Sequence, residues 1–276
     1  MTGPGSRVFT EERRTHILEL VASRGRVRVA ELADLLGVAE PTVRKDIADL
    51  DRQHLLRRTH GGALAIRPTY DPELATRARH NVEGKRAIAK ACLAWISDGD
   101  AVYLDSGTTI LALTEELRLA LTGPAGGRGE GEPAEGRHPR QVNVLTNAVG
   151  VAQVLADVPT IRHTVLGGHY RTLGGCFVGP LALEAVRQFT VNTAFIGVTG
   201  LSTAGFTVSD VAEAELKNAV MDQARRVVVV MDHTKVGAHD FRKVCALDRV
   251  DAIVTDRRHD DLARQCADAG VELVVA

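Results

Sequence analysis

The sequence has no apolar run that approaches the ~18 residues needed for a membrane-spanning helix, and no apolar core follows its first residues as in a secretory signal. Cysteine is also scarce: the thiols of Cys92, Cys176, Cys245 and Cys266 are scattered, with no CxxC pair. This spacing argues against a disulfide framework and against a zinc site. We therefore expect a cytoplasmic protein with reduced thiols and without a metal or other cofactor.

Net charge is low as well, at −1 for 276 residues, so composition alone does not indicate a nucleic-acid partner. Residues 1–80 hold 14 Lys and Arg against 11 Asp and Glu, and the remaining residues hold 20 against 24. Hydrophobic residues make up 45% of the chain, which is enough for a buried core. The length accommodates a large domain and a smaller one.

Three short helices are expected in the first sixty residues. Thr10 is placed to cap the first, Gly37 to end the second, and Pro41 to open the third, while Val27 and Val29 suggest a short strand between the first two. The apolar residues at helical spacing are Ile17, Leu20 and Val21, then Leu32, Leu35 and Leu36, then Val43, Ile47 and Leu50. Such a pattern predicts a small helical domain.

The third helix presents basic residues at its start. Thr42, Arg44 and Lys45 point away from its apolar stripe, and only three residues separate Gly37 from Pro41. Two helices joined by a tight turn, the second with basic residues in its first turns, are typical of a helix-turn-helix that contacts the major groove of DNA. The alternative is a three-helix domain whose surface cations are merely solvated.

A hairpin is expected directly after these helices. Two stretches, 55–58 and 63–66, flank the turn Thr59-His60-Gly61-Gly62. The hairpin would act as a wing that places Arg57, Arg58 and His60 on backbone phosphates. With Thr42, Arg44 and Lys45, these are the candidate DNA-binding residues.

A second candidate site lies where a buried strand at 101–104 passes into a helix at 110–121. The turn between them contains Asp105, Ser106, Gly107, Thr108 and Thr109. Hydroxyls and unpaired backbone N–H groups at the start of a helix favour a phosphate. Alternatively, Ser106 or Thr108 only caps the helix.

Strands and helices alternate through the rest of the chain, with a helix expected over 211–225 and a strand over 252–255 among them. This alternation predicts a largely parallel sheet covered by helices on both faces. Polar residues follow several strands, at the edge where ligands of such sheets bind. The candidate effector-binding residues are Asp105, Ser106, Gly107, Thr108, Thr109, Thr146, Asn147, Gly168, Arg171, Gly197, Lys217, Asp232 and Lys235. Duller explanations are open: a helix cap at Thr146 and Asn147, a turn at Gly167 and Gly168, and a surface ion pair between Glu213 and Lys217.

Two segments interrupt the pattern. Residues 64–80 contain Pro68 and Pro72 and are expected to connect a DNA-binding domain, 1–63, to a sensing domain, 81–276. Residues 122–140 are rich in Gly and Pro and are expected to form a flexible insertion outside the core. Between the two, a helix is expected from Asn81 through Trp95, whose indole is predicted to be a core aromatic.

The chain resembles the DeoR family of bacterial transcriptional regulators along nearly its whole length. The resemblance rests on Thr42-Val43-Arg44-Lys45-Asp46-Ile47, Arg58-Thr59-His60-Gly61-Gly62-Ala63, Asp105-Ser106-Gly107-Thr108-Thr109, Leu145-Thr146-Asn147, Leu166-Gly167-Gly168, Phe177-Val178-Gly179-Pro180, Ile196-Gly197-Val198-Thr199-Gly200-Leu201 and Asp232-His233-Thr234-Lys235. Ala39 and Arg28 depart from the usual Ser or Thr helix caps. The family implies a winged helix-turn-helix and a Rossmann-like α/β effector domain similar to ribose-5-phosphate isomerase, with phosphorylated sugars as effectors.

We therefore expect a repressor of sugar-metabolism genes that binds double-stranded operator DNA as a homo-oligomer, dimer or tetramer, under the control of a phosphorylated sugar. The rival is a sugar-phosphate isomerase that has a DNA-binding head. Isomerisation requires a carboxylate base, and Asp105, Asp232 and Glu213 are the candidates, none of them committed to that role by its surroundings in the sequence.

Overall fold

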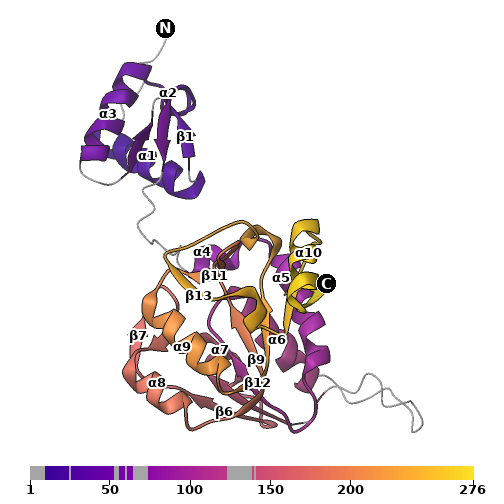
Figure 1. Ribbon diagram of the computed structural model, residues 1–276. Coiled ribbons are helices and arrows are strands. Elements are labelled where there is room, and N and C mark those ends of the chain that lie inside the picture. Colours follow the sequence, from indigo (N-terminus) through magenta and orange to yellow (C-terminus); the bar gives the residue numbers. More distant parts are fainter. Residues whose placement is uncertain are drawn as a thin grey trace. The chain divides into compact units, whose positions relative to one another are not determined.

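A computed structural model describes residues 10–24, 26–52, 56–59, 61–64, 74–122, 139 and 141–276. The chain divides into two compact units, Met1–Tyr70 and Asp71–Ala276 (Figure 1). Within the described ranges, no helix is long and apolar enough to span a bilayer.

The first unit contains three helices and a small sheet, as predicted. Its elements are α1 (Thr10–Arg24), β1 (Arg26–Arg28), α2 (Val29–Leu36), α3 (Glu40–Arg52), β2 (Arg57–Thr59) and β3 (Gly62–Leu64). Strand β3 pairs antiparallel with both β1 and β2. The predicted stripe of α3, Val43, Ile47 and Leu50, is buried against Ile17 and Leu32. Burial of these side chains is the main reason that such short helices are stable.

A buried ion pair joins the first and third helices. Arg13 Nε donates to Asp46 Oδ2 at 2.7 Å, and Arg14 Nε donates to Asp46 Oδ1 at 3.1 Å. Since both carboxylate oxygens of Asp46 are used, the pair fixes α3 relative to α1. The sequence analysis did not identify this contact.

Three predicted boundaries in this unit are wrong. Val29 begins α2 and does not extend the strand, so that Arg28 is the N-cap residue and makes no side-chain capping bond. Thr59 and Gly62 pair with each other in the β2–β3 ladder, whereas the sequence placed them in the turn. Leu55, His60, Ala65 and Ile66 lie outside the described residues.

The second unit is built around a parallel sheet. Its helices are α4 (Leu74–Ala78), α5 (Val82–Cys92), η1 (Leu93–Trp95), α6 (Thr108–Thr122), α7 (Val149–Leu155), α8 (Pro180–Val186), α9 (Val211–Met221), η2 (His233–Lys235), η3 (Leu247–Arg249) and α10 (Asp260–Ala269). The sheet strands are β4 (Ala101–Leu104), β5 (Val142–Thr146), β6 (Ile161–Val165), β9 (Val191–Gly197), β12 (Ala224–Val230), β14 (Ala252–Thr255) and β15 (Glu272–Val275). Their order is β15-β14-β12-β9-β4-β5-β6, and every neighbouring pair is parallel.

Helices cover both faces of this sheet, which confirms the predicted α/β architecture. Alternate strand residues point to opposite faces: Tyr103 joins the core under α8, α9 and α10, while Val102 and Leu104 join the core under α5, α6 and α7. Trp95 is partly buried beside the second core, with the Arg226 guanidinium 5.0 Å from its ring centroid. This supports the predicted core role for the indole.

Some elements of the second unit differ from prediction. The helix expected over 211–225 ends at Met221, because the residues from Ala224 belong to β12. The helix expected through Trp95 ends at Cys92 and continues as η1. Two antiparallel groups were not predicted: the hairpin of β7 (His169–Arg171) and β8 (Cys176–Val178), and a small sheet of β10 (Gly200–Ser202), β11 (Gly205–Val208) and β13 (Arg242–Cys245).

The structure also bears on the expected connection, 64–80, and on the expected insertion, 122–140. Helix α4 lies inside 64–80, which had been expected to be only a connection, and five residues are too few to show a helical period in the sequence. Thr122 belongs to α6, so the expected insertion starts one residue later. Residues 123–138 and 140 lie outside the described residues.

All four cysteines are free and buried. Burial raises the pKa of Cys92 to about 12 and that of Cys245 to about 11. Burial, with Glu213 as the second cause, raises the pKa of Cys176 to about 12. These thiols therefore stay protonated at neutral pH.

Candidate DNA-binding surface and effector site

The start of α3 presents two cations to solvent. Arg44 and Lys45 are exposed, and Thr42 is half-buried. The Arg44 guanidinium is 2.9 Å from Glu40 Oε2 in an exposed pair one helical turn away. Such a pair contributes only a few tenths of a kcal/mol, so the guanidinium is easily released to a base or phosphate.

The hairpin supplies a further cation. The Arg58 side chain is exposed, and its backbone N–H donates to Asp51 Oδ1 at 2.9 Å, which attaches β2 to the end of α3. Arg57 lies on the same strand, and His60 falls outside the described residues. The structure thus confirms the helices and the hairpin, and the DNA contacts of these residues stay predictions.

The effector residues meet at the carboxyl edge of the parallel sheet. From β4 the chain proceeds through β5 and β6 to one side, and β9, β12, β14 and β15 follow on the other. The strand order therefore reverses between β4 and β9, and open α/β sheets bind ligands outside such a reversal. Asp105 follows β4 at this point, and Gly197 ends β9.

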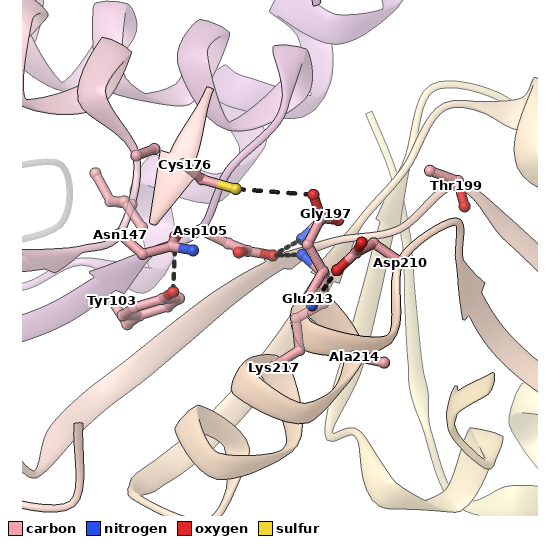
Figure 2. Close-up of polar contacts among 12 residues, drawn as sticks. Tyr103, Asp105, Asn147, Cys176, Gly197, Thr199, Asp210, Glu213, Ala214 and Lys217 are labelled. Atoms are coloured by element: carbon pink, nitrogen blue, oxygen red, sulfur yellow. Dashed lines mark hydrogen bonds and ion pairs between the residues drawn. The ribbon is translucent and has the colours of Figure 1, made fainter. Parts of the chain in front are cut away.

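A buried ion pair occupies the reversal point. The Lys217 ammonium, from α9, donates to Asp105 Oδ2, and the Gly197 N–H donates to the same oxygen at 2.9 Å (Figure 2). The two side chains are 4% and 1% exposed. Burial opposes the charge on Lys217, but Asp105 and then Glu213 outweigh it and raise the pKa of Lys217. The alternative of a surface ion pair between Glu213 and Lys217 is therefore wrong.

Glu213 has a different main partner. Arg171 Nη1 is 2.8 Å from Glu213 Oε1, Arg171 Nη2 donates to Ser209 Oγ at 3.2 Å, and Arg171 Nε is 3.3 Å from Asp210 Oδ2. The Cys176 thiol lies 3.7 Å from Glu213 Oε1. Arg171 was expected to supply a cation to a ligand, but its guanidinium is instead bonded within the protein, and it joins the β7–β8 hairpin to α9.

Thr146 and Asn147 are also used internally. Thr146 Oγ1 donates to Leu104 O at 2.6 Å and accepts from Ala148 N–H at 3.0 Å. Asn147 Nδ2 donates to Phe177 O at 2.9 Å, and its Oδ1 accepts from the buried Tyr103 hydroxyl at 2.9 Å. Neither side chain is the N-cap of α7, which is Ala148. Both residues connect β5 to its neighbours, which explains their place at the strand end without a ligand.

At the carboxyl edge of the sheet, the polar side chains at the amino end of α6 are the least engaged in hydrogen bonds within the protein. Gly107 has φ = 119°, a backbone conformation that side chains rarely tolerate. Thr108 and Thr109, half-buried, follow it in the first turn. Among the described residues, no hydrogen bond is formed by their hydroxyls, and Ser106 approaches only the Cys176 thiol. The predicted cap role for Ser106 or Thr108 has no supporting bond here.

The end of β12 contributes a second polar group. Asp232 Oδ1 accepts from Thr234 N–H at 3.0 Å and so caps η2. Lys235, in the same turn, is partly exposed, and its ammonium makes no ion pair with any described residue. Gly168 lies at the other end of this edge, where a Cβ would approach Val178 O to 2.6 Å; its φ of 153° and this contact fit a turn.

The sequence analysis missed one polar cluster at the same edge. Asp256, which follows β14, accepts from Asn81 Nδ2 at 2.8 Å and from His233 N–H at 2.7 Å. Lys85, in the first turn of α5, is buried and interacts electrostatically with Asp232 and Lys235. In the sequence, Lys85 is only a lysine among the apolar residues of an amphipathic helix, and such a lysine is common on any helix.

Two surface hollows that the structure describes lie elsewhere. One is lined by Leu201, Val236, His259 and Leu262, and the other by Leu111, Gly150 and Val154 between α6 and α7. Neither includes the strand-end residues. Several strand-end side chains, among them Asp105, Arg171 and Asn147, are engaged in the protein's own ion pairs and hydrogen bonds.

Comparison with known families agrees with both units. Residues 13–69 match the DeoR-like helix-turn-helix domain. Residues 80–122 and 136–257 match the DeoR C-terminal sensor domain. The break in the second match falls within the segment predicted to be an insertion.

Named relatives cover almost the whole chain. The HTH-type transcriptional repressor GlcR of Bacillus subtilis is 29% identical over 97% of this chain and 97% of its own length. A putative aga operon transcriptional repressor of Escherichia coli O157:H7 is 29% identical over 96% of this chain and 94% of its own. The lactose phosphotransferase system repressor of Staphylococcus epidermidis is 29% identical over 92% and 94%.

Among solved structures, ribose 5-phosphate isomerase A of Methanocaldococcus jannaschii is similar over 56% of this chain and 55% of its own, with 16% identity and a TM-score of 0.37. This likeness is too distant to bear on activity.

The named relatives are regulators. Two of the three carboxylates considered as an isomerase base, Asp105 and Glu213, form ion pairs with lysine or arginine side chains of the protein. The protein is thus a DNA-binding regulator and not an enzyme. With both of its units matched, the chain belongs to the DeoR family of bacterial transcriptional regulators.

Proposed function

We propose that this protein represses genes of carbohydrate metabolism and that a phosphorylated sugar, bound at the carboxyl edge of the large sheet, controls its affinity for DNA. The named relatives include a lactose phosphotransferase system repressor and a putative aga operon transcriptional repressor. The sensor-domain match supports a ligand-binding role for the second unit. In the first unit, Arg44, Lys45 and Thr42 would contact bases, while Arg57, Arg58 and His60 would contact phosphates.

The amino end of α6 supports the phosphoryl part of the proposal. Backbone N–H groups at a helix start carry partial positive charge, and the hydroxyls of Ser106, Thr108 and Thr109 surround it. Strand β9 alone separates β4 from β12, so their ends are roughly 10 Å apart. A pentose or hexose phosphate spans such a distance, with one end at α6 and the other at Asp232 and Lys235.

The remaining predicted residues act indirectly in this proposal. Asp105, Gly197 and Lys217 position the start of α6 against α9. Thr146, Asn147, Gly168 and Arg171 hold the neighbouring loops. The single observation on which the effector site depends is the Lys235 ammonium, which no carboxylate among the described residues neutralises.

A thermal-shift screen of the full chain against pentose and hexose monophosphates tests the proposal, because a ligand that binds only the native state raises the melting temperature. Lys235→Ala should abolish the shift and the effect of the ligand on DNA binding, while DNA affinity without ligand is retained. Lys243→Ala, at an exposed position of β13, is the matched control. An unchanged shift in Lys235→Ala would exclude that residue from the site.

Two further features belong to the proposal. A regulator with one winged helix-turn-helix gains affinity by placing two copies on successive half-sites, so a homo-oligomer, dimer or tetramer, is proposed. Action on bacterial DNA requires a cytoplasmic location. Sedimentation with and without operator DNA tests the first of these.

A further inference from the structure

Helix α4 is fastened to the carboxyl edge by a single buried lysine. Lys85 Nζ donates to Arg77 O at 2.5 Å and to His80 O at 2.6 Å. These carbonyls belong to the last turn of α4 and the turn that follows it. Lys85 is 5% exposed, so its hydrogen bonds to those carbonyls are not replaced by water in the folded state. A buried donor that loses its acceptors destabilises the folded state.

Helix α4 has further contacts with the sensing unit. Arg77 Nη2 lies 3.5 Å from Leu173 O, and a Cβ on Gly175 would be 3.3 Å from Leu74 Cδ2. Both partners lie in the loop of the β7–β8 hairpin. Helix α4 also packs against α6, the helix whose amino end is the proposed phosphate site. A helix of five residues is too short to be stable by itself and therefore depends on such contacts.

Lys85 also interacts electrostatically with Asp232 and Lys235, the other half of the proposed effector site. Burial lowers its pKa; Asp232 acts in the opposite direction, and the cations Lys235 and Arg77 lower it further. A phosphoryl group beside Lys235 would cancel one of these repulsions. It would also offer anionic acceptors, which form stronger hydrogen bonds than the carbonyls of Arg77 and His80. Arrival of the ligand therefore changes how firmly Lys85 holds α4.

The position of α4 in the chain links the hydrogen bonds of Lys85 to the DNA-binding unit. Helix α4 is the first described element of the second unit, and only residues 65–73 separate it from Leu64 of the β2–β3 hairpin. A displacement of α4 would therefore act close, along the chain, to the DNA-binding unit. No other described element of the sensing unit has so direct a connection.

We propose that Lys85 couples the effector site to DNA binding: it holds α4 in the ligand-free protein and exchanges its carbonyl acceptors for the ligand. This inference rests on the proposed effector site. Lys85 is a positioning residue for α4. Since coupling is reciprocal, DNA binding should also change the affinity for the effector by the same factor.

The test compares the full-length chain with Lys85→Met, which removes the donor and keeps the side-chain length, and with Lys90→Met, an exposed lysine on the same helix. Dissociation constants are measured for a duplex selected by the wild type from a random-sequence pool, with and without each pentose and hexose monophosphate. Hydrogen exchange of residues 74–80 is followed in the ligand-free proteins. If Lys85→Met does not fold, Lys85→Gln replaces it, since it carries no charge and is too short to reach both carbonyls.

We expect faster exchange of residues 74–80 in Lys85→Met and a ligand effect on DNA affinity that falls from about tenfold to less than twofold. Lys90→Met should behave as the wild type does. Unchanged exchange, or an unchanged ligand effect, overturns the inference. If no sugar phosphate affects the wild type, the proposed effector is wrong; the inference then stands only if Lys85→Met both speeds exchange and shifts DNA affinity at least threefold, and it fails otherwise.

Discussion

Replacing Lys217 by Met should be among the most destabilising single changes in the sensing unit. The substitution removes the ammonium that neutralises Asp105 and leaves that carboxylate buried, with the Gly197 N–H as its remaining donor among the described residues. Asp105 has two carboxylate oxygens and is 1% exposed. Water therefore does not reach it in the folded state, and the charge stays without compensation.

The magnitude follows from that burial. Breaking a buried ion pair by removing one partner costs about 3–5 kcal/mol. In a unit of this size, 1 kcal/mol shifts the melting temperature by roughly 2–4 °C, so the expected loss is roughly 6–20 °C. Changing both partners, Asp105→Asn with Lys217→Met, should restore part of the loss because no uncompensated charge remains.

Urea unfolding and thermal melts of the four proteins of this double-mutant cycle provide the measurement. Arg249→Met is the control, because Arg249 pairs with Asp222 at 2.8 Å while both side chains are more than half exposed. Such a surface pair is worth about 0–1 kcal/mol. If Lys217→Met costs no more than Arg249→Met, the argument from burial is refuted.

The same pair makes a prediction for alkaline pH. The pKa of Lys217 is raised in the folded state, so the folded protein binds its proton more tightly than the unfolded chain does. The stability from the pair is complete below the ordinary lysine pKa of about 10.4, and it is lost as the pH rises through the folded value. The difference in unfolding free energy between wild type and Lys217→Met should therefore be constant near neutral pH and shrink only above about 10.4.

Two further predictions concern the other parts of the chain. Arg44→Ala combined with Lys45→Ala should weaken operator binding by roughly 1–3 kcal/mol for each lost base contact, and should make the affinity for DNA less dependent on salt. Binding isotherms at several salt concentrations measure both effects, and a thermal melt shows whether stability is unchanged. A DNA affinity equal to that of the wild type would remove α3 from the interface. Replacing residues 123–138 by a short Gly/Ser linker should change stability by less than about 1 kcal/mol, and a variant that is unfolded by circular dichroism would place the segment in the core.

Periodicity made most of the fold predictable. The β14 strand was predicted with its observed bounds. Its four buried residues lie between polar ones, which leaves little choice of where the strand begins and ends. The α3 stripe of Val43, Ile47 and Leu50 was predicted for the same reason, since burial on one face requires helical spacing. Where elements are short, the signal is lost: α4 and the β7–β8 hairpin are fixed by tertiary contacts and not by their own propensity.

The location of the candidate site could be predicted from the sequence, but the ion pairs among its residues could not. The sequence put Asp105, Gly197 and Lys235 at strand ends, and the topology brings them to one edge. It did not show that Lys217 would pair with Asp105 across 112 positions, or that Arg171 would pair with Glu213 across 42. Such pairs depend on which helix crosses which strand, and the pattern of a single helix favours the i, i+4 partner that the fold does not use.

The four buried cysteines have a practical consequence for experiments on this protein. Thiol-reactive dyes are attacked by the thiolate, and the native sulfurs are both buried and held in the protonated form. A cysteine introduced at exposed Thr76 on α4 would thus be the preferred point of attachment with no native thiol removed. Fluorescence from that one position would follow α4 in solution, in real time, as sugar phosphates and DNA are added.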